Sequence, residues 1–241
     1  MIPAAPANGR STGVPWLAGT TIRRTAVVGW RYLVIGTAIS LLLALILLFG
    51  AHRASAFLTT FPLEVPLFAV LGSMGGLMTF TSDRTKGVFE YLIAYGIPSR
   101  TLFLNGLLST AAMSAIILGL SLLVGLGAAT ARGVTLTEDL WKSIGLYTVP
   151  MSFAGALFTA TVGMIWTSVS TPRTGINSPV GIAPMVGVAP TVLVLIVAET
   201  VPSGEFYYVT VGAAAVIIAV VVALLAMSAR IMGRERFLSP L

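Results

Sequence analysis

The sequence predicts an all-α membrane protein: six transmembrane helices, a cytoplasmic amphipathic lead-in helix, and a short cytoplasmic helix between spans two and three. Of the 241 residues, 56% are hydrophobic and 9% are charged, with a mean hydropathy of +0.97. A soluble domain carries about 25% charged residues. Apolar runs such as residues 39–49 do not alternate apolar with polar side chains as barrel strands do, so helices must satisfy the backbone.

Charge-free stretches give the number of crossings. Crossing a bilayer takes about 20 apolar residues, so each stretch is long enough for one helix and too short for two helices with a turn. The stretches are residues 32–51, 65–82, 101–131, 143–172, 174–198 and 206–229. We therefore expect a single transmembrane domain over residues 1–241, with spans at about 32–51, 62–81, 101–127, 144–168, 181–199 and 207–229.

Two segments precede the first span. Residues 1–15 contain three prolines and little apolar surface, which predicts a flexible cytoplasmic tail. Residues 16–30 mix apolar side chains with threonines and with Arg23 and Arg24, which favours an amphipathic helix in the inner membrane interface. The alternative is that this segment simply continues the first span.

Basic residues predict the orientation. With a cytoplasmic amino terminus, 11 of the 14 basic residues fall inside, and only Arg53, Arg132 and Lys142 fall outside. This is the positive-inside bias, and it places both termini of a multi-pass protein in the cytoplasm. The formal charge of +6 then reflects attraction to the anionic inner leaflet of the cell membrane rather than nucleic-acid binding.

The sequence offers little for catalysis. It has no cysteine, a single histidine (His52), and no G-x-x-x-x-G-K-[ST] phosphate loop. Glu64 and Glu199 are interpreted as flanking the outer ends of spans two and five, at the interface rather than at mid-membrane depth. We therefore expect no enzyme activity and no cofactor bound by this chain, which leaves transport by elimination.

Small residues at four-residue spacing indicate close helix packing within the membrane. The stripes are Gly72 with Gly76; Ala111, Ala115 and Gly119; and Gly155, Thr159 and Gly163.

The segment between spans two and three is the most informative. Ser82 is expected to cap a helix with Asp83 in its first turn, Gly96 and Pro98 end it, and Ser99 caps the third span. Val88, Tyr91, Leu92 and Tyr95 form one apolar face at helical spacing. A short amphipathic helix would then press on a cytoplasmic partner, or, as the alternative, lie on the inner membrane surface.

Residues 83–100, DRTKGVFEYLIAYGIPSR, resemble a segment of type-two ABC exporter permeases. The comparable positions are Asp83, Arg84, Gly87, Glu90, Leu92, Ala94, Pro98, Ser99 and Arg100. The resemblance implies a permease subunit that pairs with a second copy or a related permease, and with an ABC ATPase subunit that binds ATP and Mg²⁺. The short helix would be the coupling helix.

The resemblance also implies which residues contact the ATPase. They are Asp83, Arg84, Lys86, Gly87, Phe89, Glu90 and Ile93. Val88, Leu92 and Tyr95 would then turn toward the bundle, although the two faces could be reversed. Such families export lipids, glycans, drugs, peptides or ions, and the sequence does not select among these.

Two other functions stay open. An ion- or proton-coupled carrier or channel would place charged or unwound positions near the membrane midplane, and the six charge-free stretches argue against this. A structural membrane protein would assemble a complex without transport. A neighbouring soluble ATPase would favour the exporter over both.

Overall fold

The computed structural model describes residues 15–49, 53–169, 179–198 and 203–231, and within these ranges the chain is helical and contains no strand. The elements are α1 (Pro15–Phe49), α2 (Arg53–Thr85), α3 (Val88–Ala94), α4 (Ser99–Ala131), α5 (Glu138–Ser143), the π-helix η1 (Ile144–Thr148), α6 (Val149–Val169), α7 (Pro179–Ala198) and α8 (Ser203–Ile231). The predicted all-α class is confirmed. Most of the predicted tail, residues 1–14, lies outside the described residues.

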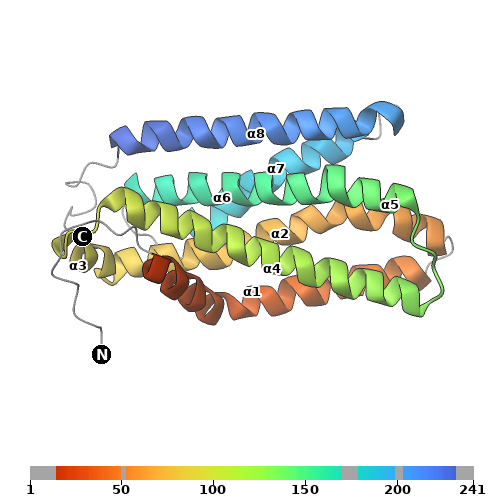
Figure 1. Ribbon diagram of the computed structural model, residues 1–241, viewed down its shortest axis with the longest axis horizontal. Helices are drawn as coiled ribbons and strands as arrows, with labels where there is room; N and C mark the ends of the chain where they lie inside the picture. The colour runs from red at the N-terminus through yellow and green to blue at the C-terminus, as the bar shows by residue number, and fades with distance from the viewer. Residues whose placement is uncertain (1–14, 50–52, 170–178, 199–202, 232–241) are drawn as a thin grey trace.

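Five helical segments are long and apolar enough to cross a membrane. They are Gly19–Phe49, Phe57–Thr85, Ser99–Ala131, Glu138–Ser168 and Glu205–Met227. Figure 1 shows these helices running along the long axis of the molecule, with α3 at one end and α5 at the other. This arrangement fits a multi-pass membrane protein.

The bundle is organised around α2, which packs against α1, α4, α6 and α7, while α8 packs mainly on α6. One apolar cluster lies near α3 and includes Leu77, Phe80 and Met164. A second joins α1, α2 and α4 around Phe57 and Phe61. A third joins α6, α7 and α8.

The lead-in segment is not a separate helix. Residues 16–30 are the first part of α1, which continues unbroken to Phe49, although Figure 1 shows its first turns at an angle to the rest. Thr25 is fully buried, and Gly29 lies so close to Gly75 that a Cβ on Gly29 would come within 3.1 Å of the Gly75 Cα. One face of this segment therefore packs against the bundle, and the segment runs on into the first span without a break, as the alternative interpretation expected.

Helix α2 begins nine residues before the predicted start of span two, and both Pro62 and Pro66 lie inside it. Glu64 is therefore not at the outer end of the helix. It lies 11 residues from Arg53, which is about 16 Å along the axis at 1.5 Å per residue. Glu64 thus lies inside the candidate span Phe57–Thr85 rather than beside it, whereas its position at the outer interface stays a prediction.

Candidate functional site

The connection from α2 to α4 is built on a glycine turn. The last turn of α2 is closed by hydrogen bonds from the Lys86 amide to the Ser82 carbonyl (3.0 Å) and from the Gly87 amide to the Arg84 carbonyl (3.1 Å). Gly87 then adopts φ 70°, a left-handed conformation that glycine enters without a Cβ penalty. The chain reverses there, and α3 begins at Val88.

This turn corrects the predicted start of the short helix. Ser82 and Asp83 belong to the end of α2, so neither lies at the start of α3. The end of α3 is as expected, because Gly96 adopts φ 85° and its amide donates to the Ile93 carbonyl at 2.9 Å. Pro98 is extended and occupies the cap position of α4, which begins at Ser99 itself rather than after a Ser99 cap.

The inward face of α3 is formed by Phe89 and Ile93, which are 5% and 4% exposed. They belong to the apolar cluster that includes Leu77 and Leu102, and the Phe89 ring lies 4.9 Å from the Phe80 ring, centroid to centroid. The expected outward position of Phe89 and Ile93 was wrong, and so was the expected inward position of Tyr95, whereas Glu90 is exposed as expected. Leu92 is partly buried against the same cluster, in line with its expected inward position.

The outward surface of α3 carries aromatic and charged groups together. Tyr91 and Tyr95 are 49% and 64% exposed, and their ring centroids lie 4.5 Å apart. A hydrogen bond with Tyr95 raises the pKa of Tyr91 above its usual value. Lys86 and Glu90 are also exposed. We call Lys86, Glu90, Tyr91 and Tyr95 the α3 surface.

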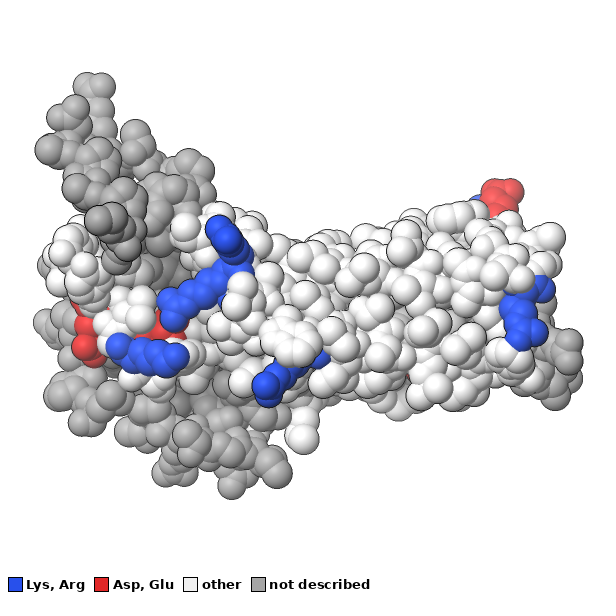
Figure 2. Space-filling view, turned by 90° about the horizontal axis from the view of Figure 1, so that it is seen from below, with Lys and Arg blue, Asp and Glu red and all other residues white. Residues whose placement is uncertain are grey.

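Asp83 does not belong to the α3 surface. Its side chain is 10% exposed and forms an ion pair with Arg24 of α1, with 2.6 Å between Oδ1 and the guanidinium nitrogen. Arg84 is partly buried. Figure 2 shows Lys and Arg side chains at this end of the molecule with acidic residues beside them. The Arg24–Asp83 pair ties the start of α1 to the end of α2, directly behind α3.

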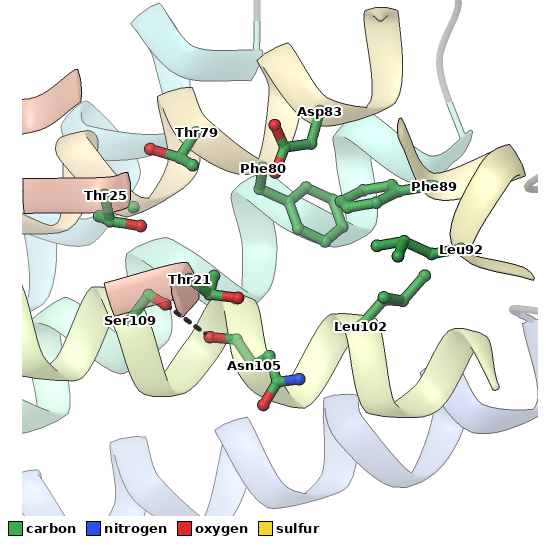
Figure 3. Close-up of a pocket in the computed structure, with 12 residues that line it drawn as sticks. Thr21, Thr25, Thr79, Phe80, Asp83, Phe89, Leu92, Leu102, Asn105 and Ser109 are labelled. Atoms are coloured by element: carbon green, nitrogen blue, oxygen red, sulfur yellow. Dashed lines mark hydrogen bonds between the residues drawn. The ribbon is translucent and has the colours of Figure 1, made fainter. Parts of the chain in front are cut away.

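A small cavity lies between these helices. It measures about 30 Å³ and is lined by Thr21 and Thr25 of α1, Thr79 and Asp83 of α2, Phe89 of α3, and residues of α4. Figure 3 shows Phe80 and Phe89 side by side, with Leu92 and Leu102 nearby, and the hydrogen bond from the Ser109 hydroxyl to the Asn105 carbonyl (2.8 Å). The volume suits a water molecule or two and is far too small for a nucleotide.

The residues that the sequence analysis assigned to the ATPase contact thus fall into three groups. Lys86 and Glu90 are exposed, Phe89 and Ile93 are buried in the bundle, and Asp83, Arg84 and Gly87 form the turn behind them. Sequence analysis missed Tyr91 and Tyr95 as outward residues. In the part of the chain that the structure describes, no group of three or more acidic, histidine or cysteine residues could hold a metal ion.

Comparisons with known protein families, with curated proteins and with solved structures find no match to this chain.

Proposed function

We propose that this chain is the membrane-spanning permease subunit of an ABC exporter, with a translocation pathway driven by ATP hydrolysis in a separate ATPase subunit. The observation that carries the proposal is the connection from α2 through α3 to α4. A short helix is held between two glycine turns at the cytoplasmic end, its apolar side is buried, and aromatic and charged side chains are exposed on its other side. The same residues carry the resemblance to type-two ABC exporter permeases.

The packing of α3 provides a route for force. Phe89 and Ile93 lie in one apolar cluster with Phe80 of α2 and Phe103 of α4, and the Phe80 and Phe103 ring centroids are 6.0 Å apart. A push on the α3 surface would reach both long helices, because close-packed interiors transmit displacement rather than absorbing it. We place the ATPase contact on Lys86, Glu90, Tyr91 and Tyr95, with Asp83, Arg84 and Gly87 supporting the turn.

The proposed topology has six crossings with both termini in the cytoplasm of the cell. Helix α7 is the proposed sixth span, since its 20 residues reach about 30 Å, the thickness of the hydrocarbon. Helix α7 runs along the bundle away from α3, because Ala183 near its start packs in the cluster near α3 and Val194 near its end packs in the cluster around Tyr147. This direction supports a crossing by α7. The functional unit is proposed to contain two permease chains and two ATPase subunits, the latter binding ATP and Mg²⁺.

An ion- or proton-coupled carrier is the second candidate. The position of Glu64 inside α2 favours it, because a carboxylate within a span is typical of proton and ion pathways. The two functions differ in their partners, since a coupled carrier has no need of an ATPase.

The test is co-purification. Tagged chain extracted from its native membrane in mild detergent should carry a second protein in about equal amount, identified by mass spectrometry and containing a G-x-x-x-x-G-K-[ST] phosphate loop. The chain alone should show no ATP hydrolysis. Absence of such a subunit, or turnover by the purified chain itself, would contradict the proposal.

A charge reversal tests the contact. Glu90→Lys should leave membrane abundance unchanged but remove most of the bound ATPase, because a misplaced charge at a desolvated interface costs several kcal/mol. Glu205→Lys is the matched control, since Glu205 is also exposed but lies at the start of α8, away from α3. If Glu90→Lys retains the ATPase as well as Glu205→Lys does, the α3 surface is not the contact.

A further inference from the structure

Glu64 is the one acidic side chain among the described residues that lies well inside a candidate span. The other described acids are near the ends of the bundle: Asp83 and Glu90 at the α3 end, and Glu138, Asp139 and Glu205 near the α5 end. Glu64 is 11 residues from the start of α2 and 21 from its end. It is 7 residues inside the candidate span Phe57–Thr85, which is about 10 Å along the helix axis.

The surface of the bundle near Glu64 is apolar. Phe61 and Val65, on either side of Glu64 in sequence, pack in the same cluster as Ala44 and Leu48 of α1. On the outer side of that level, α1 exposes Ile46 and Phe49, each 59% exposed, to the surroundings. Large apolar side chains exposed in this way are typical of a surface that faces hydrocarbon.

The described residues give the Glu64 carboxylate neither an ion pair nor a hydrogen bond, although the Tyr147 hydroxyl is within electrostatic range. The only basic side chain described near the outer end of α1 is Arg132, whose guanidinium stacks 3.7 Å from the Phe49 ring. An ionised carboxylate at membrane depth is expensive unless a cation accompanies it. Among the described residues Glu64 has no cationic partner, so a cation that binds from outside them would offset this cost.

The backbone is irregular around Glu64 in α2 and also in η1, which faces it. Pro66 lacks the amide that would bond to the Pro62 carbonyl, and the Thr148 hydroxyl donates to that carbonyl instead, at 2.8 Å. The Tyr147 hydroxyl donates to the Leu63 carbonyl at 3.1 Å. Both donors belong to the π-helix η1, an element that often marks functional sites. Hydrogen bonds from η1 thus hold in place the segment of α2 that carries the carboxylate.

Glu64 also belongs to a continuous stripe of partly exposed residues along α2. The stripe follows helical spacing toward the α3 end and is only partly covered by the neighbouring helices, since the Tyr32 hydroxyl of α1 contacts the sulfur of its last residue, Met78, at 2.8 Å. Its members are Thr60, Glu64, Leu67, Leu71, Met74 and Met78. We call it the α2 stripe. Methionine adapts to ligands of varied shape, and below Glu64 the stripe carries no charge.

We propose that Glu64 recognises a lipophilic organic cation, whose charge pairs with the carboxylate and whose apolar body lies along the α2 stripe. This chemistry fits the site because a single carboxylate, without a basic partner among the residues that the structure describes, supplies the counter-charge, and leucine and methionine supply the apolar contact. The substrate class of the exporter follows only if the proposed function holds. Binding of the cation itself is independent of the ATPase.

The test uses two probes of the same shape and opposite charge, tetraphenylphosphonium and tetraphenylborate, on the purified full-length chain without ATPase. Saturable binding in detergent is measured by calorimetry or equilibrium dialysis against empty micelles. Wild type should bind the phosphonium cation and not the borate anion. Glu64→Gln should weaken cation binding by at least about tenfold, as expected for loss of a desolvated charge partner, whereas Glu64→Asp should retain most of it.

Glu205→Gln serves as the matched control, because it removes an equivalent exposed charge at the outer end of α8 and should leave binding unchanged. Three results would overturn the proposal: no saturable cation binding by wild type, equal binding of cation and anion, or equal cation affinity in wild type and Glu64→Gln. If Glu64→Gln leaves the cation affinity unchanged but alters the pH dependence of transport in proteoliposomes, Glu64 carries a proton instead. Failure to find an ATPase subunit would contradict the exporter without affecting these binding results.

Discussion

At the residue scale, Gly87 sets the direction in which the chain leaves α2. With φ 70°, an added Cβ would meet only the Glu90 carboxylate at 3.5 Å, so the cost of a substitution lies in the backbone rather than in packing. Gly87→Ala should therefore destabilise the protein by about 1–2 kcal/mol. Thermal unfolding in detergent, followed by tryptophan fluorescence, should show a lowered midpoint.

Two variants make this prediction specific. Gly87→Asn should recover part of the loss, since asparagine tolerates the left-handed conformation. Gly119→Ala should not destabilise, because Gly119 is helical and an added Cβ finds nothing within 4 Å. A Gly87→Ala midpoint equal to that of wild type would mean that the α2–α3 turn is not under the constraint described.

The two faces of α3 show what residue patterns could and could not predict. Gly96 and Pro98 predicted the end of the helix correctly, because their backbone preferences are local. The choice between the two faces was ambiguous, since apolar residues at helical spacing occur on both. Phe89 and Ile93 are purely apolar, whereas Tyr91 carries a hydroxyl that prefers water, and this difference was the signal that could have decided the matter.

At the element scale, the small residues of α2 determine how closely α4 approaches. A Cβ on Gly76 would lie 2.0 Å from the Thr110 hydroxyl and 2.8 Å from the Thr110 Cα. Because the second contact is with backbone, a change of the Thr110 rotamer cannot relieve it. Gly76→Ala should force the two helices apart and destabilise the bundle by about 1–3 kcal/mol.

Comparing unfolding midpoints of Gly76→Ala and Gly119→Ala in the same detergent tests this packing. Both substitutions add one methyl group to a helical glycine in a candidate span, but only the first meets another helix. Equal midpoints would show that α2 and α4 are not as close as described. The sequence predicted close packing for both positions, and it could not tell a glycine facing a helix from one facing the surroundings.

Proline explains why the start of α2 was misjudged. Two prolines beside a glutamate resemble the boundary of a span, and the sequence alone does not show that hydroxyls of η1 compensate the lost backbone bonds. Those donors are more than 80 residues away in the chain. Because the span was predicted to start near residue 62, Glu64 was placed at its outer end. The candidate cation site could therefore not be recognised before the helices were placed side by side.

At the scale of the whole molecule, composition and charge spacing predicted the helical class and the approximate positions of the five candidate spans, because the bilayer imposes length and backbone pairing on every crossing. The arrangement of helices around α2 did not follow, since it depends on side chains distant in sequence. The number of crossings remains a prediction: five helices meet the criteria for a span, and the sixth crossing rests on α7.

The location of the two termini decides between these numbers. Six crossings keep both ends in the cytoplasm, whereas five would place the carboxyl end outside. Single cysteines introduced by Asn8→Cys and Ser239→Cys should both resist a membrane-impermeant thiol reagent on intact cells and react after permeabilisation. The native chain has no cysteine, so the background is clean.

Thr135→Cys provides the outward control, because Thr135 is exposed in the connection between α4 and α5 and should react on intact cells. Reaction of the cysteine at position 239 from outside, with position 8 protected, would mean that α7 does not cross. The positive-inside count would then fail as well, since it places Arg230, Arg234 and Arg236 on the cytoplasmic side. The crossing by α7 and the positive-inside count are thus tested by the same measurement. Protection of both ends would support six spans.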